Sequence, residues 1–248
     1  MARILCVYDE GAVVDTPLIG AKGFSVLVES EGRRVLFDTG LRDRYLIHNM
    51  EHLEIDPASI DAVVVSQKCP DNSRGINGLI EAREQPLDIY APEGLYDGKR
   101  GIMSRSVGLS EENRAKANIH PIDGWIEVAP KVWVTPQLVS DDGSSESFLV
   151  IEGRELAVIS GRGCSGPGLP LAAVRERFGR EARTFVGAVL LEKRKKPVAE
   201  AYASEFEAYG CRSLHLNHCV GPDGMSNLRA HFGLKGVDDF YAGMELTI

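Results

Sequence analysis

Residues 62–75 read AVVVSQKCPDNSRG, a short apolar run followed by a polar loop. Consecutive valines are typical of a strand that is buried on both faces of a sheet. The loop after them contains Lys68, Cys69, Asp71 and Arg74. Since α/β sheets carry their functional groups beyond the carboxyl ends of the strands, we expect part of a functional site here.

Three other polar loops follow predicted strands in the same way. They are residues 38–40, the glycine-rich residues 160–168, and residues 215–221, which include His218 and Cys219. Both halves of the chain begin with strands and continue with mixed helices and strands, a pattern that periodicity classifies as α/β with mixed sheets. The strands are expected at 4–8, 24–29, 33–37, 60–66, 87–91, 125–128, 132–134, 147–151, 156–160, 184–191 and 213–216, and the helices at 41–53, 75–83, 169–178, 198–209 and 225–232. Residues 93–118 are polar, and we expect an irregular flap with a short helix there.

The composition excludes several classes of protein. The chain has 248 residues, of which 44% are hydrophobic, too many for a disordered protein. It has neither the roughly 20-residue apolar run of a membrane span nor the pattern of a secretory signal. A net charge of −8 argues against nucleic acid as a partner. Five cysteines without a CxxC pair predict reduced thiols and a cytoplasmic location, and the length fits one domain over residues 1–248.

Several short motifs occur in a defined order along the chain. Gly23-Phe24-Ser25 precedes Phe37-Asp38-Thr39-Gly40, and both precede the loop of residues 66–75. The second half contains two more, Gly163-Cys164-Ser165-Gly166-Pro167-Gly168 and His218-Cys219-Val220-Gly221. This order resembles the metallo-β-lactamase superfamily, and more narrowly the branch of the dihydropterin ribofuranosyl-aminobenzene phosphate synthases. The resemblance implies an α/β (α+β) fold, a four-layer αββα sandwich of two mixed β-sheets with helices on the outside.

The resemblance also implies a metal site, from which this sequence departs. Enzymes of the superfamily bind one or two metals, usually zinc, through an HxHxDH loop and later ligands. Asp71 matches the aspartate of that loop, and His218 matches a late histidine. The other family histidine positions hold Lys22, Gln67, Cys69, Asn72, Gly166 and Val189.

The retained donors suffice for at most a single zinc ion. Zinc prefers three or four nitrogen, sulfur or oxygen ligands, and the candidates are Cys69, Asp71 and His218. Asp71, Cys69 and Cys164 are the candidate catalytic residues, since a thiol among backbone amides can act as a nucleophile. For Cys164, the alternative is a small residue in a tight turn.

Cations on the same loops suggest a second kind of site. If they converge where the family holds its metal, they would bind a phosphate or a carboxylate. Amides of the glycine-rich turn could cradle the same group. Solvated side chains and ordinary turn glycines are the alternative. The candidate ligand-binding residues are Lys22, Lys68, Asn72, Arg74, Arg162, Gly163 and Ser165.

Three hypotheses therefore remain open. In the first, which we prefer, the protein has no metal cofactor and binds a small anionic molecule, phosphate- or pterin-like, without two-metal hydrolysis. In the second, it is a divergent hydrolase or lyase with a single zinc ion on Cys69, Asp71 and His218. In the third, it is a non-catalytic scaffold or regulatory subunit that assembles with itself or with a partner protein.

Overall fold

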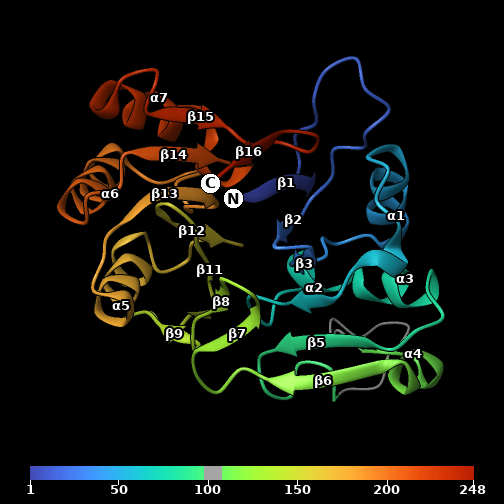
Figure 1. Cartoon of the computed structure of the whole chain (residues 1–248). Helices are drawn as coiled ribbons and strands as arrows, with labels where there is room; N and C mark the ends of the chain where they lie inside the picture. The colour runs from blue at the N-terminus through green and yellow to red at the C-terminus, as the bar shows by residue number, and fades with distance from the viewer. Residues whose placement is uncertain (98–107) are drawn as a thin grey trace.

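The computed structural model describes residues 1–97 and 108–248, and the first half of the chain builds one mixed sheet (Figure 1). Its order is β16-β1-β2-β3-β4-β5-β6, so the last strand of the chain pairs with the first. The strands are β1 (Ala2–Tyr8), β2 (Ser25–Ser30), β3 (Arg33–Phe37), β4 (Ala62–Val64), β5 (Leu87–Ala91), β6 (Ala117–Pro121) and β16 (Glu245–Thr247). The helices of this half are α1 (Asp43–His52), the 3₁₀ turn η1 (Pro57–Ser59), α2 (Pro70–Ser73), α3 (Ile76–Glu81) and α4 (Glu111–Ala115).

The second half builds the other large sheet, in the order β15-β14-β13-β12-β11-β8-β7. Its strands are β7 (Ile126–Ala129), β8 (Val132–Val134), β11 (Leu149–Glu152), β12 (Leu156–Ser160), β13 (Ala182–Gly187), β14 (Ser213–Leu216) and β15 (Val237–Asp239). β9 (Leu138–Val139) and β10 (Ser145–Glu146) form a separate two-stranded ribbon. The helices are α5 (Gly168–Phe178), α6 (Lys196–Ala208), the 3₁₀ turn η2 (His218–Val220) and α7 (Gly221–Phe232).

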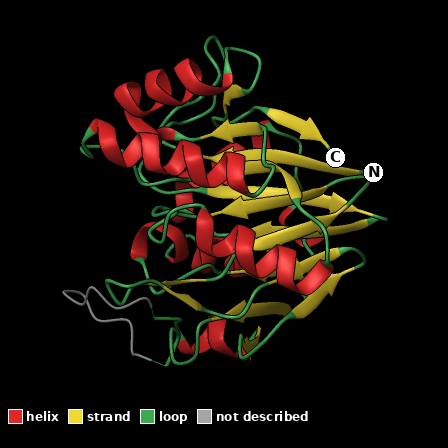
Figure 2. Cartoon of the chain, turned by 90° about the vertical axis from the view of Figure 1, so that its left-hand side faces the viewer, coloured by secondary structure: helices red, strands yellow, loops and turns green. Residues whose placement is uncertain are grey.

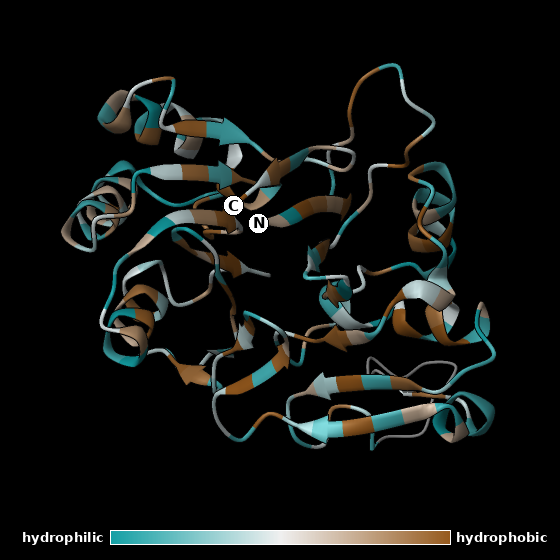
Figure 3. Cartoon of the chain, viewed as in Figure 1, coloured by the Kyte–Doolittle hydropathy of each residue, from teal (hydrophilic) through white to brown (hydrophobic). Residues whose placement is uncertain are grey.

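The layers follow from the alternation of side chains along each strand. In β3, Leu36 packs toward the helices of its own half, whereas Val35 and Phe37 belong to the cluster between the sheets. In β12, Val158 faces α5 to α7 and Ile159 faces the other sheet. Successive strand residues point to opposite faces, so one apolar strand serves two cores. Hydrophobic residues accordingly run along the strands of both sheets (Figure 3).

The helices cover the outer faces of the two sheets. α1 and α3 lie on one side in Figure 1, and α5, α6 and α7 lie on the other. Figure 2 shows the second group of helices crossing in front of the strands. The predicted four-layer αββα sandwich is therefore confirmed. Within the described part of the chain, no helix combines the length and the apolar character that a membrane crossing requires.

Local sequence explains several element ends. Glu31 and Gly32, with φ of 48° and 81°, form the two-residue turn of the β2–β3 hairpin, and turns of this kind need positive φ at both positions. Gly179 ends α5 in the left-handed conformation at φ 63°. Only glycine adopts that conformation without a steric cost at Cβ.

Two sequence predictions of local structure are wrong. The strand expected at 184–191 ends at Gly187, and the apolar residues after it are buried in a loop rather than in the sheet. The flap expected at 93–118 contains the predicted short helix, α4, but it is not irregular at its end, where β6 begins and pairs in parallel with β5. Within that stretch, residues 98–107 lie outside the described residues.

Candidate functional site

Loops from both halves of the sandwich meet at the strand-end edge and enclose a cavity of about 360 Å³. The loops follow β1, β4, β12, β13 and β14, which are the ends where an α/β sheet exposes its functional groups. The predicted site loops at 66–75, 160–168 and 215–221 all contribute to it. The lining residues are Glu10, Lys22, Gly23, Phe24, Asp71, Asn72, Gly161, Arg162, Leu190, Glu192, Lys193, His218 and Cys219.

Asp38 holds the loop after β4 in place. Its Oδ1 accepts the Ser66 N–H at 2.8 Å, and its Oδ2 accepts the Ser66 hydroxyl at 2.8 Å and the Asn72 amide at 2.5 Å. Asn72 also donates to the Gly161 carbonyl at 3.3 Å, which ties this loop to the other half of the sandwich. Burial raises the pKa of Asp38 to about 7, although the hydrogen bonds from Ser66 and Asn72 oppose the shift.

Glu146 organises the glycine-rich loop after β12 in a similar way. Its carboxylate is buried and accepts the backbone N–H groups of residues 161–164 and the hydroxyl of Ser160, at 2.8–3.2 Å. A row of backbone amides is a typical cradle for an anion. In this protein the anion is a side chain of the chain itself, so the amides that we expected to cradle a phosphate already have an acceptor.

Two side-chain cations, one from the loop after β12 and one from the loop after β1, contact candidate site residues. Arg162 donates from Nη1 to the Sγ of Cys69 at 2.9 Å. Lys22 forms an ion pair of 3.1 Å with Asp71. In the described ranges, Arg162 has no carboxylate within ion-pair distance, so most of the five donors of its guanidinium remain for another partner.

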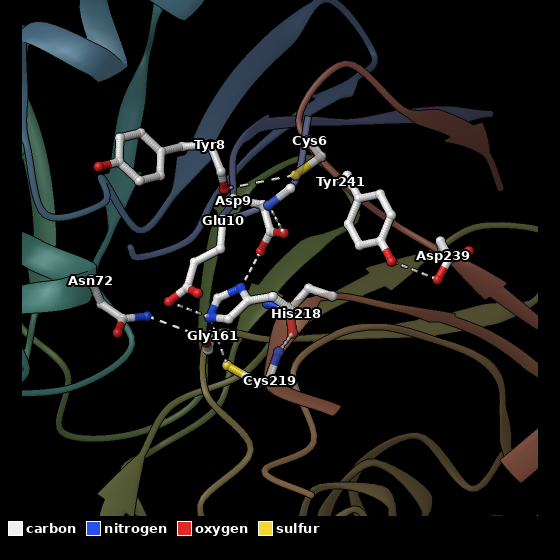
Figure 4. A network of polar contacts seen from close by, with 12 residues as sticks. Cys6, Tyr8, Asp9, Glu10, Asn72, Gly161, His218, Cys219, Asp239 and Tyr241 are labelled. Carbon is white, nitrogen blue, oxygen red and sulfur yellow. Dashed lines mark hydrogen bonds and ion pairs between the residues drawn. The ribbon is translucent and has the colours of Figure 1, made fainter. Parts of the chain in front are cut away.

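His218 is surrounded by acidic groups and a thiol (Figure 4). Its Nδ1 lies 2.5 Å from Oδ1 of the fully buried Asp9, and its Nε2 lies 3.4 Å from Oε1 of Glu10 and 3.3 Å from Sγ of Cys219. Burial alone would lower the pKa of His218, but the hydrogen bond to Asp9 raises it to about 10. At neutral pH the imidazole is therefore protonated and paired with Asp9.

The three candidate metal donors do not form a metal centre. Cys69 is engaged by Arg162, Asp71 by Lys22, and His218 by Asp9. Over residues 1–97 and 108–248, no group of three or more histidine, cysteine, aspartate or glutamate side chains is placed so that it could hold a metal ion. The residues present do not fit the metal site that the resemblance implies.

The structure brings some of the predicted ligand-binding residues together. Lys22, Asn72 and Arg162 line the cavity, together with the candidate metal donors Asp71 and His218. The remaining candidates lie outside its lining: Lys68, Cys69, Arg74, Gly163, Cys164 and Ser165.

Three of these outlying candidates have specific neighbours. Lys68 is exposed and its Nζ approaches Gly94. The Gly163 N–H is donated to Glu146. Burial, together with the negative charge of Glu146, raises the pKa of the Cys164 thiol to about 11.

Sequence reasoning missed several residues that shape the site. Asp9 and Glu10 follow β1 directly, so the strand-end rule that selected the other loops would have found them. Lys193 lines the cavity, although it was not among the candidate ligand-binding residues. Glu146 carries no sequence signal, because its partners lie 14 to 18 residues further along the chain.

Comparisons with known proteins agree with this fold. The chain is 28% identical over 98 residues to the 7,8-dihydropterin-6-methyl-4-(β-D-ribofuranosyl)-aminobenzene-5′-phosphate synthase of Methanocaldococcus jannaschii. That alignment covers 38% of this chain and 33% of the relative, so it spans about a third of the relative's length. No family model matches the sequence.

Solved structures match over the whole chain. The metal-dependent hydrolase Tm1679 of the β-lactamase superfamily superposes with a TM-score of 0.79 and 23% identity, covering 100% of this chain and 99% of that one. The metallo-β-lactamase fold protein YhfI of Bacillus subtilis gives 0.67 and 13%, with all of both chains covered. A diphosphatase of the PhnP family gives 0.67 and 14%, covering 100% and 98%.

Proposed function

We propose that this chain, which has the metallo-β-lactamase fold, binds a small anionic molecule in the cavity at its strand-end edge and does so without a metal pair. The observation that carries the proposal is Arg162. Its guanidinium lines the cavity, and within the described residues its partner is a thiol rather than a carboxylate. A guanidinium with spare donors is suited to a phosphate or carboxylate, which it binds through two parallel hydrogen bonds.

The loop that carries Arg162 is held in one conformation. Glu146 fixes the backbone N–H of Arg162 at 2.8 Å and those of both neighbouring residues. A cation on a fixed backbone loses less conformational freedom when it binds a ligand than one on a free loop. This favours Arg162 as the anchor of the anionic group.

The other charges around the cavity are balanced. Lys22, Lys193 and Arg162 face the carboxylates of Glu10, Asp71 and Glu192, and the charge of protonated His218 is paired with Asp9. Among these cations, Arg162 therefore stands out as the one without a carboxylate partner in the described part of the chain. A cavity of about 360 Å³ accommodates a small molecule. The name of the relative from M. jannaschii describes a product with a dihydropterin and a 5′-phosphate, which is one chemistry of this kind.

The test is a calorimetric titration with inorganic phosphate, and in parallel with 6-methylpterin. We expect phosphate to bind wild-type protein and Arg162→Gln to weaken binding by about tenfold or more, since a hydrogen bond between charged groups contributes about 1.5–3 kcal/mol. Arg154→Gln is the matched control, because Arg154 is exposed and does not line this cavity. If 6-methylpterin binds and phosphate does not, the ligand of the cavity is neutral rather than anionic.

Two results would overturn the proposal. One is that Arg162→Gln binds phosphate as tightly as wild-type protein. The other is a stoichiometric transition metal in the purified protein that is lost in both Asp71→Ala and His218→Ala, because this would place a metal where we place the anion.

A further inference from the structure

Cys219, His218 and Asp9 form a chain of hydrogen-bonding side chains at the wall of the cavity (Figure 4). The Sγ of Cys219 lies 3.3 Å from Nε2 of His218, and Nδ1 of the same ring lies 2.5 Å from Oδ1 of Asp9. Oδ2 of Asp9 accepts the Gly11 N–H at 3.0 Å, so the carboxylate is itself held in position. Cys219 itself had no role in the anion site described above.

This order of groups is the one that activates a nucleophile. A nucleophilic side chain lies within hydrogen-bond reach of a base, and a third group orients that base. Asp9 is fully buried and belongs to the opposite half of the sandwich, so the two residues meet only when the two halves pack together. Its contact with Nδ1 leaves Nε2 directed toward Cys219.

The backbone around Cys219 is fixed as well. Its N–H donates to Oδ1 of Asn217 at 3.1 Å, and its carbonyl accepts the N–H groups of Leu191 and Glu192 at 3.1 and 2.9 Å. Nδ2 of the same Asn217 amide is buried and has no hydrogen-bond partner in the described part of the chain. The residue that holds the Cys219 backbone therefore has one donor without an acceptor.

The other four thiols lack this combination. Cys6 and Cys211 are buried in the core, and Cys69 is buried beneath Arg162. Cys164 is partly exposed, but the nearby Glu146 carboxylate disfavours its thiolate. Cys219 is partly exposed, lines the cavity and has an imidazole in reach.

We propose that Cys219 is the nucleophile of an acyl-transferring or hydrolytic site, with His218 as its acid and base and Asp9 as a positioning residue. The substrate class is a small thioester or activated ester that carries an anionic group. This identity rests on the anion site proposed above, whereas the reactivity of the thiol does not depend on it.

The reaction balances without a further co-reactant. In the reactive form the proton lies on Nε2 of His218, and the Cys219 sulfur attacks the acyl carbonyl carbon as a thiolate. A carbon–sulfur bond forms, the bond to the leaving thiol or alcohol breaks, and His218 returns the proton to that leaving group. Water then attacks the acyl–cysteine thioester and gives one proton to Nε2 of His218. The carbon–sulfur bond breaks and the carboxylic acid is released, which restores the Cys219 thiolate beside protonated His218. Arg162 lines the same cavity as Cys219, and a fixed cation there would stabilise negative charge that develops during the reaction.

The experiment uses p-nitrophenyl acetate as the probe, with mass-spectrometric mapping of the acetyl group. We expect a burst of one p-nitrophenolate per chain and one acetyl group on Cys219. Cys219→Ser should abolish the burst while phosphate binding remains. Asp9→Asn should slow acylation by about 100-fold, the lower end of what a general base contributes. His231→Asn, at an exposed ion pair on α7, is the control histidine change and should leave the burst unchanged.

Failure of this proposal is distinguishable from failure of the anion site. No burst, or acetylation of Cys164, Cys69 or a lysine in wild-type protein, overturns the role of Cys219 whatever phosphate does. An undiminished burst in Cys219→Ser does the same. Because wild-type protein alone can give the first of these results, the test does not depend on the variants folding. Protection of Cys219 by phosphate would place both proposals in the same cavity, and a burst that phosphate leaves unaffected would overturn the anionic substrate class.

Discussion

The carboxylate of Glu146 is the residue whose loss should most affect both the fold of the site loop and the proposed anion site. We predict that Glu146→Gln destabilises the protein and weakens phosphate binding. The substitution keeps the size of the side chain and replaces one acceptor oxygen by an NH₂ group. Every recorded partner of Glu146 is a donor, so the new amide nitrogen must face N–H groups.

The magnitude follows from the contacts of the two oxygens. Oε1 accepts from Ser160, Gly161 and Arg162 and, at 3.2 Å, from Gly163, whereas Oε2 accepts from Gly163 at 2.9 Å and Cys164 at 3.2 Å. The less costly orientation therefore places nitrogen at Oε2. It leaves the part-buried Cys164 N–H without an acceptor, at about 1–3 kcal/mol, and the Gly163 N–H with only its longer contact to Oε1. Burial raises the pKa of Glu146, so removing its charge recovers part of this cost. We expect a net loss of about 1–3 kcal/mol, a sizeable part of a typical stability of about 5–15 kcal/mol.

The assay is urea unfolding at neutral pH, compared with Glu155→Gln, which removes an exposed carboxylate from the neighbouring β11–β12 turn. The midpoint should fall for Glu146→Gln at an unchanged slope and should stay at the wild-type value for the control. A loss below about 1 kcal/mol, with phosphate affinity intact, would refute the assignment of Glu146 as the group that orders this loop.

Three further predictions concern the same strand ends. Gly161→Ala should destabilise the protein by about 3 kcal/mol or more in urea unfolding, because a Cβ would lie 2.1 Å from Oδ2 of Asp38. The control Gly124→Ala should not destabilise it, because a Cβ there meets nothing within 4 Å. Equal urea midpoints for the two variants would contradict this packing argument. The pKa of Asp38 is raised from 3.8 to about 7 in the folded state, so the folded state keeps a proton that the unfolded state releases. Stability should therefore fall by up to about 4 kcal/mol as pH rises from about 4 to about 7. Asp38→Asn should flatten the dependence of the urea midpoint on pH, and an unchanged dependence would show that other groups cause it. The raised pKa of His218 contributes stability that is complete below about pH 6.5 and is lost as pH rises toward about 10. The melting temperature of His218→Asn should therefore not decline over this alkaline range. If the variant still shows the decline, the pair of His218 with Asp9 is not its cause.

Much of the fold could be predicted because the strands of the two cores are strongly patterned. The run at 33–37 and the turn after residue 30 predict the β2–β3 hairpin, and the structure has it in register. Strand β6 was missed because Ala117–Pro121 contains few residues that favour strands. Its pairing comes from β5, through contacts between chain segments that no local pattern records.

The position of the site could be predicted from the sequence, but the contacts between its residues could not. The strand-end rule located the loops that meet at the cavity, because parallel strands carry their carboxyl ends to one edge. It could not show that Glu146 occupies the amides of the loop after β12, or that Asp9 faces His218. The first contact joins β10 and a loop, both in the second half of the chain, and the second joins the two halves of the sandwich. Neither contact follows from a local sequence pattern.

The charges of the site explain why the retained donors do not form a metal centre. In the metal-binding pattern, a cation is surrounded by donors that carry or share negative charge. In this chain Asp71 and Cys69 are donors of this kind, but the side-chain cations of Lys22 and Arg162 lie beside them. A divalent ion at the same place would face both positive charges at short range, and two like charges about 4 Å apart repel by several kcal/mol near a protein surface. Gln67, Cys69 and Asn72, which stand where the superfamily has histidines, and the two cations beside Cys69 and Asp71 all disfavour a metal ion at this place. This agrees with the anion that we propose for the cavity.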